Sequence, residues 1–318
     1  MAIFPLRLVP PNTKIDFIGK RKIAFVLSAL LIIASMGFFA IKGLNYGIDF
    51  KGGILMEVRT PGPADIDGLR SKLSGLGLGE VAIQEFGQPT DVLIRVERQP
   101  GGEKAQQVAV DTVKTALGTA VASYRRTEFV GPKVGGELIQ AGVLAVVLSL
   151  FAIMVYVWFR FEWQFSVGAV VALIHDVIVT IGIFSVLGLE FNLATVAAIL
   201  TIAGYSINDT VVVFDRIREN LRKFKTMGIE DLLNQSLNQT LSRTLLTSVT
   251  TLLALFAIFF FGGAVIRDFA FALIWGVFVG TYSSVYVASP VVMMLNIRGN
   301  ISSGSVGGAE KEQELLSD

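Results

Sequence analysis

A single carboxylate stands inside a long apolar stretch of the sequence. Asp209 lies in the run 193–214, which is long enough to cross a bilayer. Keeping a carboxylate ionised there costs about 2.5–3.5 kcal/mol on membrane-insertion scales. A chain retains such a group chiefly where the gain or loss of its charge is used, so Asp209 is predicted to carry protons or ions. The alternative is a static carboxylate, held in an ion pair or bonded to Asn208 and Thr210.

An arginine and a histidine–aspartate pair are the other charged groups near apolar runs. Arg243 precedes the run 245–261, and an arginine in that position usually extends its charge to the membrane interface. His175 and Asp176 lie near the middle of the run 165–187. Adjacent residues point about 100° apart on a helix, which argues against a cooperating acid–base dyad. Asp176 is therefore the better relay candidate, and a structural hydrogen bond between helices is nearly as good an explanation.

Two glycine-rich segments border the region 43–136. The first suits a tight turn or a close backbone approach, and it lacks the strand–loop–helix context and GK[ST] ending of a phosphate loop. The second suits a hinge, with a fixed corner as an equal alternative. The residues concerned are Gly47, Asp49, Gly52 and Gly53 in the first segment, and Gly131, Pro132, Gly135 and Gly136 in the second.

Composition excludes several kinds of chemistry. The chain has no cysteine and only one histidine, which excludes disulfides, thiolate chemistry and a multi-histidine metal site. No nucleophile stands beside a base. We therefore expect no metal, no cofactor and no enzymatic activity. The net charge of +1 gives no reason to expect nucleic acid as a partner.

The charged groups are positioned by six apolar runs. Hydrophobic residues make up 53% of the chain, charged residues only 17%, and the mean hydropathy is +0.63. Runs of about 17–25 apolar residues are candidate membrane spans. They cover residues 23–41, 138–159, 165–187, 193–214, 245–261 and 269–295, and Pro290 is expected to kink the last run or mark its exit.

Basic residues set the expected orientation. They cluster in the segment 1–22 and between the fourth and fifth runs, which places both segments on the cytoplasmic side. With six spans, the C-terminus is also cytoplasmic and the region 43–136 lies outside. The predicted parts are a cytoplasmic segment 1–22, a first span 23–42, an outer domain 43–136, five spans over 137–298 and a disordered cytoplasmic tail 299–318.

Two non-spanning segments have helix or strand patterns of their own. In the outer domain, residues 54–60, 81–86, 92–97 and 121–129 read as strands, with helices over 63–76 and 103–117. The resulting order βαββαβ is the ferredoxin-like arrangement. Residues 87–91 are expected to be the loop between two strands. The segment 216–243 is amphipathic and is expected to lie on the cytoplasmic headgroups and to pack under the bundle, with a mobile coupling element as the alternative.

Several segments in this order resemble the SecF family of bacterial protein-export membrane proteins. The resemblance runs from about residue 44 to residue 288. It rests on the sequences Gly47-Ile-Asp-Phe-Lys-Gly-Gly53, Phe129-Val-Gly-Pro-Lys-Val-Gly-Gly-Glu-Leu138, His175-Asp176, Gly204-Tyr-Ser-Ile-Asn-Asp-Thr-Val-Val-Val-Phe-Asp-Arg-Ile-Arg-Glu-Asn220, Asn238-Gln-Thr-Leu-Ser-Arg-Thr-Leu-Leu-Thr-Ser248 and Gly280-Thr-Tyr-Ser-Ser-Val-Tyr-Val-Ala288.

The resemblance implies a fold and a set of site residues. The family is similar to the resistance-nodulation-division (RND) transporters, which work as two proton-driven halves of six spans each. The implied fold is an all-α bundle of six transmembrane helices, forming one RND-type half, with an extracytoplasmic α+β ferredoxin-like domain. The residues implied in proton transport are Asp209, Arg243, Asp176 and His175, with Arg243 at the place of the arginine partner.

The resemblance also implies a function and partners. The implied function is a proton-motive-force-driven accessory subunit of the Sec protein translocase, acting with SecD in late steps of export across the bacterial inner membrane. The implied partners are SecD, the SecYEG channel, the SecA motor, the exported unfolded polypeptide and the lipid bilayer. A proton-coupled RND-type exporter of small molecules or lipids is the alternative, and an assembly scaffold without ion coupling is a third hypothesis.

Overall fold

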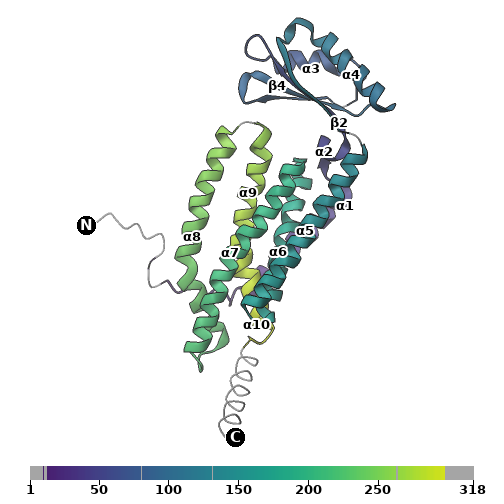
Figure 1. Ribbon diagram of the computed structural model, residues 1–318. Helices are drawn as coiled ribbons and strands as arrows, with labels where there is room; N and C mark the ends of the chain where they lie inside the picture. The colour runs from purple at the N-terminus through teal and green to yellow at the C-terminus, as the bar shows by residue number, and fades with distance from the viewer. Residues whose placement is uncertain (1–9, 11–12, 80, 131, 263, 298–318) are drawn as a thin grey trace, which may run out of the picture.

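The chain forms a long helical bundle that carries a small α+β domain at one end (Figure 1). The computed structural model describes residues 10, 13–79, 81–130, 132–262 and 264–297. The expected tail 299–318 and Gly131 lie outside these residues.

Within the described residues, six helices are long and apolar enough to cross a membrane, which confirms the six predicted runs. They are α1 (Arg21–Lys42), α5 (Pro132–Arg160), α6 (Trp163–Leu187), α7 (Leu193–Lys223), α8 (Ile229–Phe261) and α9 (Ala264–Ser283). The last span continues through a π-helical turn, η2 (Ser284–Ala288), into α10 (Ser289–Met294).

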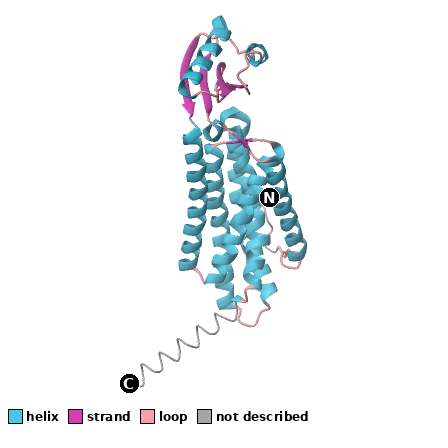
Figure 2. Cartoon of the chain, turned by 90° about the vertical axis from the view of Figure 1, so that its right-hand side faces the viewer, coloured by secondary structure: helices cyan, strands magenta, loops and turns pink. Residues whose placement is uncertain are grey.

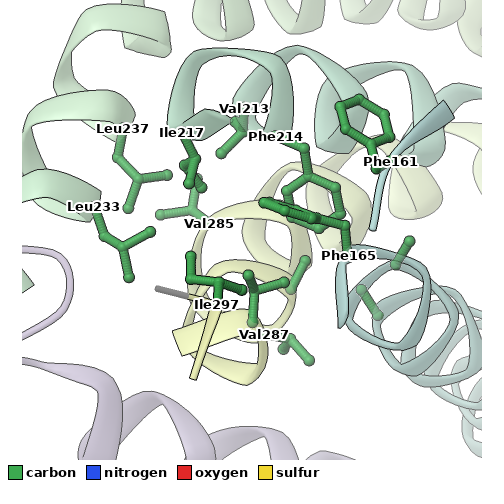
Figure 3. Close-up of a cluster of buried hydrophobic side chains, with 14 of the residues drawn as sticks. Phe161, Phe165, Val213, Phe214, Ile217, Leu233, Leu237, Val285, Val287 and Ile297 are labelled. Atoms are coloured by element: carbon green, nitrogen blue, oxygen red, sulfur yellow. The ribbon is translucent and has the colours of Figure 1, made fainter. Parts of the chain in front are cut away.

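Helices α6 and α9 form the centre of the bundle, whereas the most apolar stretch of α5 is not buried within the chain at all. Near the end that carries α10, aromatic rings of α6 and α7 meet the last helix (Figure 3). Phe165 and Phe214 lie with their ring centroids 5.0 Å apart in an edge-to-face contact. Glycine permits a close crossing of α7 and α9, because a Cβ at Gly280 of α9 would lie 3.0 Å from the Cβ of Ser206 on α7. This glycine therefore serves packing within the chain.

The small domain has the predicted order of strands and helices. It contains β2 (Gly53–Arg59), α3 (Ile66–Ser74), β3 (Val81–Phe86), β4 (Gln88–Glu97), α4 (Gly102–Leu117), a 3-10 turn η1 (Gly118–Ala120) and β5 (Ser123–Val130). The strands pair antiparallel in the order β3-β4-β2-β5. Alternate residues of β2, such as Ile54 and Met56, are buried beneath α3 and α4, which cover one face of the sheet (Figure 2).

The expectation of a loop over 87–91 is wrong for most of that segment. Gly87, with φ of 74°, makes the turn between β3 and β4, and strand β4 already begins at Gln88. Asp91 pairs with Arg59 in the ladder and accepts two hydrogen bonds from its guanidinium, at 2.6 and 2.9 Å. This ion pair supplies hydrogen-bond donors to the carboxylate of Asp91, a residue that the sequence placed in a loop.

The structure also differs from the expected amphipathic segment 216–243. Its residues belong to the ends of α7 and α8, which are separated only by a turn. Ile217 and Leu237 are buried in the bundle core. Asn220 of α7 donates to Ser236 Oγ of α8 at 2.8 Å. The apolar stripe therefore packs one helix against the other, so the segment does not form a separate helix lying along the membrane surface.

A small joint connects the domain to the bundle. Strand β1 (Asn45–Tyr46) follows α1 and pairs in parallel with β6 (Glu190–Phe191), which lies between α6 and α7. A short helix, α2 (Ile48–Lys51), then leads into β2. The glycine-rich segment that follows the first span thus contacts the corner where α7 begins.

Candidate functional site

Asp209 faces the interior of the bundle from α7, with 4% of its surface exposed. Thr244 of α8 donates its hydroxyl to Asp209 Oδ1 at 3.0 Å. The buried Oδ2 has no hydrogen-bond partner within the described ranges. The alternative bond to Thr210 is not formed, because that hydroxyl bonds to the Ser206 carbonyl at 3.1 Å and to Ser284 Oγ at 2.8 Å.

Arg243 lies one residue before Thr244, and it is exposed on α8. No ion pair joins it to Asp209 in the part of the chain that the structure describes. The pairing of Arg243 with Asp209 was expected only from the family resemblance. In this conformation, however, the neutral hydroxyl of Thr244 holds the carboxylate.

His175 and Asp176 are in contact, so the expectation that these adjacent side chains on α6 point apart is wrong. His175 Nδ1 lies 3.0 Å from Asp176 Oδ1, and both side chains are buried. The helical offset separates the directions of the Cα–Cβ bonds, but the longer imidazole side chain reaches back to its neighbour. His175 Nε2 is buried and lacks a hydrogen-bond partner among the described residues.

Two serines that the sequence reading did not assign to the site complete the surroundings of Asp176. Ser206 of α7 donates to Asp176 Oδ2 at 2.7 Å, and Ser283 of α9 donates to the same oxygen at 2.8 Å. Asp176 therefore ties together three helices. In the sequence, both serines stand out only as members of the family-like segments 204–220 and 280–288, because no local signal distinguishes a serine that bonds a distant carboxylate.

The π-helical turn η2 begins directly after Ser283. Ser284 pairs with Thr210 of α7, and Ser289 Oγ donates back to the Ser284 carbonyl at 3.0 Å. Single π-helical turns within α-helices occur frequently at functional sites. Pro290 follows and cannot donate a backbone hydrogen bond, so it was the one sequence signal for an irregular helix here.

Helix α7 carries contacts to both carboxylates. Ser206 and Asp209 are three residues apart and lie on the same face. Ser206 contacts the Asp176 centre, Asp209 contacts Thr244, and Thr210 contacts the π-helical turn. A shift or rotation of α7 would therefore change the bonding of both buried acids.

The glycine-rich residues lie at the joint rather than near these acids. Gly52 and Gly53 have φ of 76° and 150°, which favour glycine. A Cβ at Gly47 would lie 2.5 Å from Glu190 Oε1. Asp49 Oδ2 accepts a hydrogen bond from the Leu193 amide at 3.0 Å, at the start of α7.

The second glycine-rich segment begins α5. Pro132 is its first residue. A Cβ at Gly135 would collide with the backbone carbonyl oxygen of Phe50, whereas at Gly136 it would meet nothing within 4 Å. The contact at Gly135 favours the fixed corner over the hinge at that position.

Within the described residues, no group of three or more His, Cys, Asp or Glu side chains could hold a metal ion. The arrangement instead offers two buried carboxylates with hydroxyl donors on neighbouring helices. Such a site can bind and release protons, because a carboxylate changes its proton affinity when donors and charges around it move.

Comparison with known proteins gives the family. The family described as "Protein export membrane protein SecD/SecF, C-terminal" matches residues 109–298, and the SecD/SecF GG motif matches residues 37–60. The chain is 48% identical to the protein translocase subunit SecF of Rhodobacter capsulatus, over 93% of both chains. It is 44% identical to that of Rickettsia rickettsii, over 92% of this chain and 96% of the relative.

A solved structure has the same architecture. The chain is 39% identical to SecDF from Thermus thermophilus, a translocon-associated membrane protein, with a TM-score of 0.77. The match covers 92% of this chain but only 40% of the SecDF chain. This six-span membrane protein, with its GG motif and its buried aspartates, belongs to the SecD/SecF family of protein-export membrane proteins.

Proposed function

We propose that the chain is a proton-driven accessory subunit of the Sec protein translocase and that Asp209 carries the proton. The relatives named as protein translocase subunits support the export role, since they align over nearly their whole length. The single observation that carries the proton role is the unequal hydrogen bonding of the two Asp209 carboxylate oxygens. Its Oδ1 has one hydroxyl donor, and its Oδ2 is buried without one among the described residues.

A second six-span half, SecD, is the proposed direct partner. The chain matches 40% of a SecDF chain, so the remainder of that protein offers room for the other half. Polar side chains are exposed on α7 and α8 on either side of Asp209, although both helices are long enough to span a membrane. They are Thr201 and Asn208 on α7, and Arg243 and Thr250 on α8. The threonine hydroxyls donate to carbonyls of their own helices. In a bilayer it is therefore Asn208 and the charge of Arg243 that need a protein or water partner.

In the proposed cycle, Arg243 moves toward Asp209 when a partner helix covers this face. The carboxylate would then hold its charge against the arginine and release its proton, and it would take up a proton again when the arginine withdraws. His175 and Asp176 are the proposed relay members on the other side of α7. SecYEG, SecA and the exported polypeptide are the proposed wider assembly.

The proposed topology follows the basic residues. Both termini lie in the bacterial cytoplasm, and the small domain lies outside the inner membrane. Its strand and helix order, together with the sheet order β3-β4-β2-β5, supports a ferredoxin-like domain. The protein is proposed to need no cofactor and to perform no enzymatic step.

The test replaces Asp209 by asparagine, which keeps the shape and removes the titration. Asp209→Asn is expected to insert and to assemble with SecD, but to lose gradient-dependent export in membrane vesicles. Asp215→Asn is the matched control, because Asp215 lies near the end of the same helix in a partly exposed ion pair with Arg160. Normal export by Asp209→Asn would overturn the proposal.

A further inference from the structure

Three separate contacts connect the outer domain and the segment 45–53 that leads into it to the beginning of α7. This segment lies within the GG motif and is called the GG-motif segment below. The first is the parallel pairing of β1 with β6, in which Gly47 also donates its amide to the Phe191 carbonyl at 2.9 Å. Residues 45–47 are thereby held against residues 190–191. This pairing places the segment that leads into the outer domain directly beside the corner that precedes α7.

The second contact is a cap on α7. The Asp49 carboxylate accepts the amide of Leu193, the first residue of that helix. The first amides of a helix have no partner within it, and a carboxylate near them also interacts favourably with the helix dipole. Asn192 fills the capping-box position at the same end. Asp49 therefore attaches the GG-motif segment to the end of α7 itself.

The third contact is an ion pair between the domain and the bundle. Arg95 of β4 pairs with Glu190 of β6, and both side chains are largely buried. Burial raises the pKa of Glu190, while the Arg95 guanidinium opposes that rise. The Glu190 amide donates to Asp268 Oδ2 of α9 at 3.3 Å. Arg95 is thus the cation that balances a carboxylate at the start of α7.

From these contacts we infer that Arg95, Glu190 and Asp49 form a coupling joint that transmits movement of α7 to the outer domain. These are positioning residues, since none of them contacts Asp176 or Asp209. The inference rests on the proposed function, because it assigns a route by which a change at Asp209 reaches the domain outside. The joint transmits movement because the Arg95–Glu190 ion pair and the bond from the Leu193 amide to Asp49 stay formed, or closed, while α7 moves.

The geometry of α7 supports this route. Asp209 lies sixteen residues after Leu193, about 24 Å along one uninterrupted helix at 1.5 Å per residue. A continuous helix moves as a rigid element, so a shift that accompanies a change at Asp209 also displaces the Leu193 end. The close approach of Gly47 to Glu190 leaves little room for slippage at the joint.

The first experiment reverses the ion pair. In vesicles containing the full translocase, Arg95→Glu should lower gradient-dependent export by at least about fivefold, the lower range of coupling between sites. Proton flux that depends on Asp209 should persist. The double variant Arg95→Glu/Glu190→Arg should recover export. Arg98→Glu is the matched control, because Arg98 is exposed on the segment directly after β4, and it should behave as the parent.

A second experiment does not depend on how well the reversed pair fits. The chain has no cysteine, so within it Arg95→Cys/Glu190→Cys can be joined specifically by a short bis-methanethiosulfonate cross-linker, which forms a reducible disulfide with each thiol and releases sulfinate. The reduced variant should be impaired in export, and the cross-linked variant should regain it, because a closed joint transmits movement. Equal activity in both states, or loss of activity on cross-linking, would overturn the inference.

The proposed function and the coupling joint can be disproved independently. If Asp209→Asn exports normally, the proposed function is wrong. If Asp209→Asn is inactive while Arg95→Glu exports as the parent does, only the coupling joint is wrong. Loss of proton flux in Arg95→Glu would also count against the joint, because the defect would then lie in the bundle.

Discussion

At the residue scale, the two buried aspartates differ in how completely they are bonded. Asp176 has His175 at one oxygen and two serine donors at the other. Asp209 has a single threonine donor. A fully bonded buried group holds a structure in place, whereas an unbonded buried oxygen is costly and is expected to have a task. This contrast favours Asp209 as the group whose bonding changes during function.

Thr244 is predicted to matter because it supplies that single donor. Thr244→Val should reduce gradient-dependent export by about tenfold or more, since a hydrogen bond to a charged group contributes about 1.5–3 kcal/mol. Thr244→Ser should retain most of the activity. Thr240→Val on the same helix is the control, because its buried hydroxyl donates to the Ser236 and Leu237 carbonyls of α8. Equal export by Thr244→Val and the parent would contradict this role.

The sequence identified Asp209 but not its donor. An acid within an apolar run is a local signal. Helix α8, by contrast, carries many serines and threonines with the same local pattern. Only the packing of α7 against α8 selects Thr244 among them. The contact between His175 and Asp176 was missed for a related reason. Helical geometry fixes the direction of each Cα–Cβ bond, but it does not fix where the far end of a long side chain lies.

At the scale of elements, the six spans could be predicted because each apolar run carries its own signal. The π-helical turn and the true extent of α7 and α8 could not. An amphipathic stripe looks the same whether it faces headgroups or a neighbouring helix, and here Ile217 and Leu237 face the core. The strand β4 extends into a segment of residues that are common in turns, because Asp91 accepts a hydrogen bond from Arg59 on the neighbouring strand.

The fixed corner at the start of α5 gives a matched pair of predictions. Gly135→Ala should destabilise the protein by about 1–3 kcal/mol, because the added methyl group meets the Phe50 carbonyl. Gly136→Ala should be neutral or slightly stabilising, since its position is open. Thermal unfolding in detergent measures both. If the two variants proved equally stable, the close contact at Gly135 would be of no consequence.

The outer domain should lose stability in acid through Asp91. The hydrogen bond from Arg59 holds the pKa of Asp91 below its ordinary value of 3.8. Its contribution to stability is therefore complete above that value and is lost as the pH falls through the lowered pKa. Hydrogen exchange in the outer domain, corrected for intrinsic rates, should show this loss in the parent. Asp91→Asn should flatten it, and Asp67→Asn, at an exposed pair on α3, should not.

At the scale of the whole molecule, the small domain and the helical bundle meet at a joint built from residues far apart in the sequence. Asn45 pairs with Glu190, and Arg95 binds the same Glu190. No periodicity or local motif predicts such pairings, although the glycines that permit them are visible. We therefore propose that the bundle binds protons and that the joint attaches the small domain to the bundle.

The most direct test of the central claim is gradient-dependent export by Asp209→Asn in vesicles that contain the complete translocase. Export driven by ATP alone, measured in the same vesicles, controls for assembly. The account predicts that the variant assembles and keeps the ATP-driven part, but no longer responds to a proton gradient. An undiminished response to the gradient would contradict the claim that this buried carboxylate drives the protein.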